Sequence, residues 1–166
     1  SQLVFKQSTA EKAKLGTLHH LSSCIYEFSG RLLDPQERAI LETVGAQLES
    51  ATFSLTLGLY RQAFTSLRLA LEMGLAAIYF SAHRIELHEW LDGRMDIKWS
   101  KLVDEETGVL SKRFAKAFFA EMADEIEAYR IESCAVYRKL SEYVHGNNET
   151  WVDDIRFTYK STLFDR

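Results

Sequence analysis

Apolar side chains recur every three or four residues along most of the chain, which is the spacing of one face of an α-helix. The clearest run extends from Tyr60 to about Ala82, and we expect a long core helix there. Similar patterns predict helices over residues 9–29, 35–57, 111–129 and 130–145, the last two either separate or continuous. Short helices and turns are expected in between. The pattern therefore predicts an all-α protein, a bundle of about five helices.

Polar residues and glycines predict where several of these helices begin and end. Ser8-Thr9-Ala10-Glu11 has the form of a capping box, so we expect the first helix to begin near Thr9. Asp34 followed by Pro35 places a capping carboxylate before a proline in the first helical turn, which predicts the second start. Gly58 is the expected break before the core helix.

The last segment of the chain has a different pattern. Apolar and polar residues alternate over residues 155–160, which is typical of a strand. We therefore divide the chain into a helical domain, residues 1–148, and a C-terminal tail, residues 149–166. The tail is expected to pair with a neighbour, to dock on the helices or to lead into a further domain.

Charge and composition narrow the possible functions. The chain has 166 residues and a formal net charge of −4, so it does not have the basic character of proteins that coat duplex nucleic acid. Any contact with nucleic acid is therefore expected to be local. Cys24 and Cys134 are too few and too far apart for a disulfide framework. Neither a signal peptide nor a membrane span is evident in the sequence, and we expect a cytoplasmic protein without membrane partners.

Arg138 and His145 form the most informative pair in the sequence. They stand seven residues apart in a predicted helix, about two turns, so both project from nearly the same face. Histidine can accept or donate a proton near neutral pH, and arginine can hold phosphate oxygens. RNA carries its own nucleophile, the 2′-hydroxyl. The pair thus suits RNA cleavage without a metal ion or cofactor.

The segment around this pair resembles the catalytic motif of the HEPN superfamily, in which an arginine and a histidine are separated by four to six residues. Gly58-Leu59-Tyr60-Arg61-Gln62-Ala63 and Ser141-Glu142-Tyr143-Val144-His145-Gly146 are also similar to HEPN proteins of prokaryotic abortive-infection and defence systems. The resemblance implies a HEPN-like bundle and a homodimer with a composite ribonuclease site. It implies a toxin or antiviral effector that cleaves RNA, with a regulatory protein or antitoxin as a further partner.

The resemblance assigns catalysis to Arg138 and His145, and Lys139, Tyr143 and Asn147 are secondary candidates for substrate contact. The alternative is a catalytically inactive HEPN-like module for dimerisation, nucleotide binding or protein interaction. Lys139 favours it, because the family often has Asn, Asp or His after the arginine. In that case Arg138 and His145 would bond carboxylates, and a buried His145 on a carboxylate would support it.

Other polar clusters have simpler interpretations. Arg68 and Glu72 have the spacing of an intrahelical ion pair, and the alternative is that they orient the catalytic helix. The cluster of His83, Glu86, His88 and Glu89 does not have the spacing of a zinc motif. Lys112, Arg113 and Lys116 form a small basic face, which is either a solvated surface or a guide for RNA.

Overall fold

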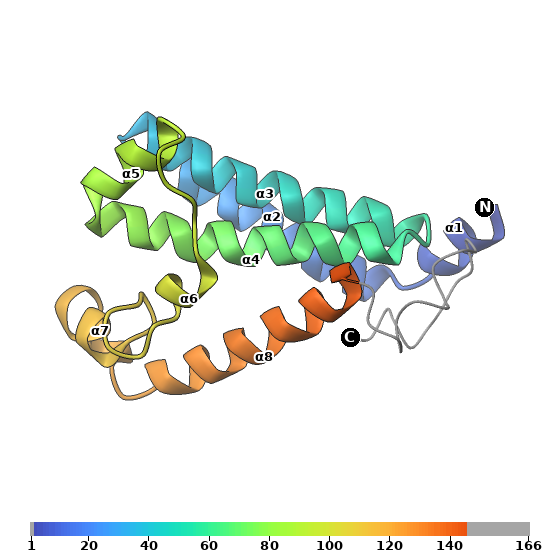
Figure 1. The fold of residues 1–166 in the computed structure, drawn as a ribbon. Coiled ribbons are helices and arrows are strands. Elements are labelled where there is room, and N and C mark those ends of the chain that lie inside the picture. Colours follow the sequence, from blue (N-terminus) through green and yellow to red (C-terminus); the bar gives the residue numbers. More distant parts are fainter. Residues whose placement is uncertain (1, 146–166) are drawn as a thin grey trace. The chain divides into compact units, whose positions relative to one another are not determined.

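The structure is a computed structural model, and it describes residues 2–145. Within this range the chain is a helical bundle of eight α-helices and one 3-10 helix, without a strand (Figure 1). It forms two compact units. Among the described residues, one contains residues 2–71 and 139–145, and the other is Glu72–Arg138. The prediction of an all-α bundle is confirmed, while the predicted strand and tail lie outside the described residues.

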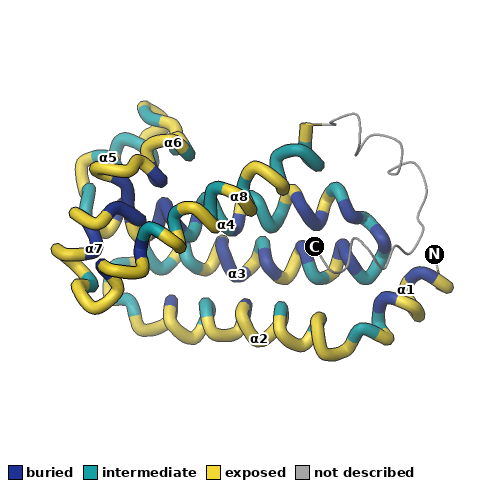
Figure 2. The backbone as a smooth tube through the Cα atoms, turned by 90° about the horizontal axis from the view of Figure 1, so that it is seen from below, coloured by how far each residue is buried: buried dark blue, intermediate teal, exposed yellow. Residues whose placement is uncertain are grey.

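The first unit is built on α2 (Lys12–Ser29) and α3 (Pro35–Thr56), which pack side by side as a hairpin (Figure 1). Gly45 of α3 permits the close approach, because a Cβ there would lie 2.8 Å from Cζ of Tyr26. The Ser22 hydroxyl donates to Oε1 of Glu49 across the same contact at 3.3 Å. Much of α2 faces solvent (Figure 2).

The start of α3 agrees with the sequence. Oδ1 of Asp34 accepts hydrogen bonds from the backbone N–H groups of Gln36, at 2.8 Å, and Glu37, at 3.1 Å. Pro35 is the first residue of the helix, where its missing N–H costs nothing. At the other end, Gly58 adopts a φ of +74°, which glycine accommodates without a steric penalty.

The expected capping box near Thr9 is wrong. A short helix, α1 (Gln2–Ser8), occupies this region, and α2 begins only at Lys12. The Thr9 hydroxyl donates back to the carbonyl of Phe5 at 2.8 Å, so it satisfies the end of α1 instead of opening a new helix. Glu11 precedes α2 without a side-chain capping bond.

Two long helices belong to both units. The core helix α4 (Tyr60–Ala82) has the bounds that its apolar pattern predicted, and α8 (Ile126–His145) carries the Arg138–His145 motif. By length and composition α4 could cross a membrane, with a mean hydropathy of 1.3 over its most apolar window. In the structure 44% of that window is buried, so the helix is only partly covered and favours neither location. Cytoplasmic location therefore stays a prediction.

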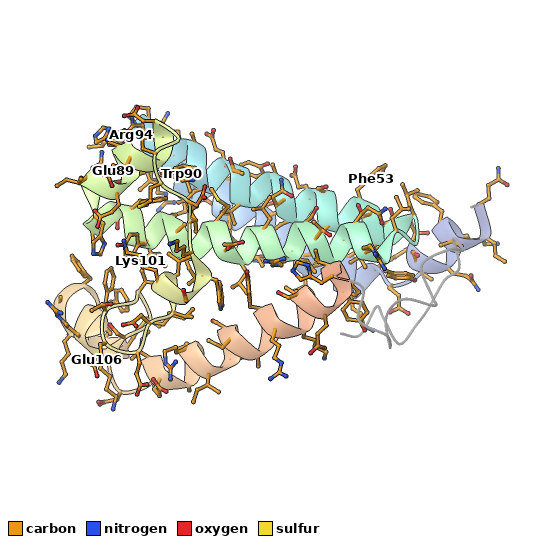
Figure 3. The ribbon with its side chains drawn as sticks, viewed as in Figure 1. Phe53, Glu89, Trp90, Arg94, Lys101 and Glu106 are labelled. Atoms are coloured by element: carbon orange, nitrogen blue, oxygen red, sulfur yellow. The ribbon has the colours of Figure 1, made fainter. Side chains whose placement is uncertain are left out.

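The second unit adds three short helices to α4 and α8. These are α5 (Arg84–Leu91), α6 (Trp99–Leu102) and α7 (Lys112–Phe118), followed by the 3-10 helix η1 (Ala120–Met122). The half-buried Trp90, labelled in Figure 3, stacks on the buried Phe80 with ring centroids 5.3 Å apart. Trp99 of α6 stacks on Tyr137 of α8 at 3.8 Å. Short helices were expected in this region.

The predicted long helix over residues 111–129 is interrupted. Its start is nearly correct, since Oγ of Ser111 accepts from the backbone N–H of Phe114 at 3.1 Å and caps α7. The helix then ends at Phe118, because Phe119 adopts φ −154° and ψ 64°, outside the helical region. The Phe114 ring contacts both Phe118 and Phe119, at 4.6 and 5.9 Å. The three rings therefore pack together at the turn, and α8 starts at Ile126.

Candidate active site

The motif helix α8 carries the described candidate residues. Arg138, Lys139 and His145 are exposed, and Tyr143 is half-buried. Because α8 is continuous over Ile126–His145, Arg138 and His145 lie about two turns apart on one helix. Arg138 is the last residue of the second compact unit, and its position relative to His145 follows from the continuous helix that carries both. Asn147 lies outside the described residues.

The last turns of α8 are anchored on α4 by aromatic packing. The ring of Tyr143 lies 4.4 Å, centroid to centroid, from the ring of Phe64 in a tilted contact. Tyr143 and Leu140 pack against a buried cluster that includes Tyr60 and Leu55. The aromatic ring of Tyr143 thus has a packing role, and its contact with substrate stays a prediction.

Two residues beyond Tyr143, the same packing brings His145 to Arg68. Nη1 of Arg68 lies 3.3 Å from Nε2 of His145. A guanidinium has donors only, so the contact is a hydrogen bond when Nε2 carries the lone pair and Nδ1 the proton. Arg68 is half-buried, and its Nε atom is shielded from solvent. Its stem is therefore held while its outer nitrogen reaches the exposed histidine.

The described surroundings of His145 lack the carboxylate partner that the inactive alternative predicts. Within residues 2–145 its side chain contacts an arginine, not a carboxylate, and its exposure leaves room for a ligand. An imidazole and a guanidinium at this distance both suit a phosphate group, which can accept hydrogen bonds from each. The arrangement can therefore bind an anion and move a proton at the same place.

The other polar cluster named from the sequence is engaged within the fold. Nδ1 of His83 donates to the carbonyl of Tyr79 at 2.9 Å, and the Tyr79 hydroxyl donates to Glu86 at 3.4 Å. Across the part of the chain that the structure describes, no three His, Cys, Asp or Glu side chains are grouped so that they could hold a metal ion.

Arg68 has a contact that the sequence could not identify. Its spacing from Glu72 suggested an intrahelical ion pair or a role in orienting the catalytic helix, and the structure places its outer nitrogen next to His145, 77 positions away. A signal was present, because Arg68 lies one turn after Phe64, whose ring faces Tyr143. The signal could be interpreted only once α4 and α8 were known to pack through these rings.

Comparisons with known proteins give no relative: models of protein families, curated proteins and solved structures all fail to match the chain. The fold and the site are therefore the only basis for inferring a function.

Proposed function

We propose that this protein is a metal-independent RNA endonuclease of the HEPN type, acting in the cytoplasm as a homodimer and serving as a toxin or antiviral effector. The observation that carries the proposal is the contact of the exposed His145 with Arg68, in a helix that presents Arg138 two turns earlier. A structural histidine bonded to a carboxylate would have argued for an inactive module. The resemblance of the motif to HEPN proteins supports the same conclusion.

In the proposed reaction the 2′-oxygen of RNA attacks the adjacent phosphorus. The bond from phosphorus to the 5′-oxygen breaks, which leaves a 2′,3′-cyclic phosphate and a 5′-hydroxyl. An imidazole accepts the proton of the 2′-hydroxyl, and an imidazolium donates one to the leaving 5′-oxygen. Arg138 binds the non-bridging oxygens and stabilises the charge that develops on them.

Arg68 is proposed as a positioning residue for His145. Its N–H donates to Nε2, which orients the imidazole ring. A bound phosphate competes for the same guanidinium. When Arg68 turns to the phosphate, Nε2 is released and becomes available to the 2′-hydroxyl. Substrate binding and activation of the base would thus be coupled through one side chain.

The dimer follows from the number of proton transfers. Cleavage requires one group that accepts a proton and one that donates it, and the motif offers a single imidazole in each chain. A two-fold axis beside α8 would supply the second. Control of a composite site by a regulatory protein or antitoxin is a further part of the proposal.

The alternative is a non-catalytic HEPN-like module, which Lys139 next to Arg138 favours. Both possibilities are separated by incubating the purified chain with mixed RNA in EDTA. We expect cleavage by the wild type and at least about a hundredfold loss in Arg138→Ala, since a group acting on the transition state typically contributes 10² or more. Full activity in Arg138→Ala would contradict the proposed role of this residue.

A further inference from the structure

The second unit contains a cavity of about 320 Å³ between the end of α4 and α7, at the low end of the range for small-molecule sites. Phe114 and Phe118 form apolar walls, and Arg113 and His83 supply polar groups. No aspartate or glutamate is among the described residues that line it. The cavity shares no residue with the candidate active site.

His83 is held in a fixed orientation at this cavity. Its Nδ1 donates to the carbonyl of Tyr79 at 2.9 Å, which identifies Nδ1 as the protonated nitrogen. The imidazole also stacks on the Tyr79 ring, with centroids 3.9 Å apart and planes within 5°. Nε2 is therefore the ring atom that is left for a ligand.

Tyr79, on which His83 stacks, is held in place by contacts of its own. The Tyr79 hydroxyl donates to Glu86 at 3.4 Å, and Nζ of Lys101 lies 5.1 Å from the centroid of the Tyr79 ring. Lys101 is also 3.8 Å from Glu86, so its charge is largely balanced. Preorganisation of this kind lowers the entropic cost of binding at the cavity.

Thr107 and Ser111 close one side of the cavity with hydroxyl groups. Their loop is fixed by Asp104, which accepts from the backbone N–H and the hydroxyl of Thr107, both at 2.8 Å. These hydrogen bonds hold the pKa of Asp104 below its usual value, so the carboxylate stays ionised at neutral pH. The loop is thus a preformed part of the cavity.

Arg113 and the phenylalanines define the chemistry of the ligand. Arg113 is exposed and makes no ion pair or hydrogen bond with other residues of the described range. Phe118 is 63% exposed beside it, although its ring contacts Phe114 at 4.6 Å. A large aromatic side chain with this exposure leaves apolar surface that a flat ligand would cover.

We propose that this cavity binds a small aromatic anion: a flat ring against Phe114 and Phe118, with a carboxylate or phosphate on Arg113, next to the fixed imidazole of His83. This binding site is additional to the proposed ribonuclease function and does not depend on it. The ring and the anionic group are both required, because the cavity offers one surface for each.

The test is calorimetric titration of the full chain with phenyl phosphate, benzoate, phenol and inorganic phosphate. The first two ligands combine ring and charge, and each of the other two has one of them. We expect phenyl phosphate or benzoate to bind at least about tenfold more tightly than phenol and inorganic phosphate, because a charge-assisted contact adds to ring burial. The stronger of the two identifies the anionic group. Absence of saturable binding of both at millimolar concentration would overturn the proposal.

Matched variants locate the binding on the molecule. Arg113→Gln should weaken the tighter ligand by about tenfold, as expected for loss of a charged hydrogen bond. Lys116→Gln removes the same charge from the same helix outside the cavity and should change affinity by less than about twofold. Equal losses in the two variants would overturn the proposal. The proposal would also be overturned if Arg138→Gln weakened binding of the ligand while Arg113→Gln did not, since the anion would then bind on α8.

Discussion

At the scale of single residues, the contact between Arg68 and His145 joins two groups that are both basic. Such a pair gains little from mutual attraction, and an anion between the two would stabilise both. The half-buried stem of Arg68 fixes where its guanidinium can reach. This geometry is compatible with the phosphate binding that we propose.

Substitution of Arg68 should lower RNA cleavage mainly through kcat. Arg68→Met keeps the length and the apolar stem but removes the donors, and we expect a loss of about tenfold or more. Arg68→Lys retains one charged donor and should restore part of this loss. Steady-state kinetics with a defined RNA provide the measurement. If Arg68→Lys and Arg68→Met were equally slow with unchanged folding, the proposed donation to His145 would be wrong.

Two substitutions at Tyr143 distinguish a packing role of its ring from a contact of its hydroxyl with the substrate. Tyr143→Phe keeps the ring on Phe64 and should therefore lower the free energy of unfolding less than removal of the whole ring does. Tyr143→Ala removes a half-buried ring and should cost about 2 kcal/mol. Urea denaturation measures both. If Tyr143→Phe instead loses cleavage with full stability, the hydroxyl contacts the substrate, as the sequence suggested.

At the scale of secondary structure, the sequence predicted helix boundaries correctly where they depend on a short local motif or on a long apolar pattern. Asp34 and Pro35 begin α3 as expected, and the apolar pattern of α4 gave its bounds. The break at Phe119 could not be predicted, because it depends on how the Phe114 ring packs on its neighbours. Arg138 and His145 could be placed on one helix from their spacing, whereas the partner of His145 required tertiary structure.

Two glycines with opposite surroundings test the local packing. A Cβ on Gly108 would lie 2.5 Å from the backbone nitrogen of Asp104, which cannot move without the whole turn, so Gly108→Ala should destabilise the protein by about 1–3 kcal/mol. Gly16 lies within α2 and has no atom within 4 Å of an added Cβ. Gly16→Ala should therefore stabilise the protein by about 0.5–1 kcal/mol. Thermal unfolding checks both signs, and destabilisation by Gly16→Ala would contradict the described environment of α2.

At the scale of the whole molecule, a net charge of −4 means that the proposed interaction with RNA depends on local basic groups. The exposed Arg138, Lys139 and His145 provide such a group on α8. One chain offers one copy of each, which makes assembly part of the proposed mechanism.

The oligomeric state provides a separate test of this composite site. Sedimentation equilibrium at micromolar concentration should give about twice the chain mass of 19.1 kDa. His145→Ala should retain that mass, because the residue is proposed to act on substrate. A chain that stays monomeric at high concentration while cleaving RNA would contradict a site shared between two subunits.

The central claim is that His145 moves protons during RNA cleavage, and product analysis in EDTA tests it most directly. We expect the wild type to release 2′,3′-cyclic phosphate ends from RNA and to leave DNA of the same sequence intact, since DNA lacks the 2′-hydroxyl. His145→Ala should release none, while the control His88→Ala, at another exposed histidine, should behave as the wild type. The account is contradicted if the wild-type dimer leaves RNA intact, or if His145→Ala cleaves as fast as the control.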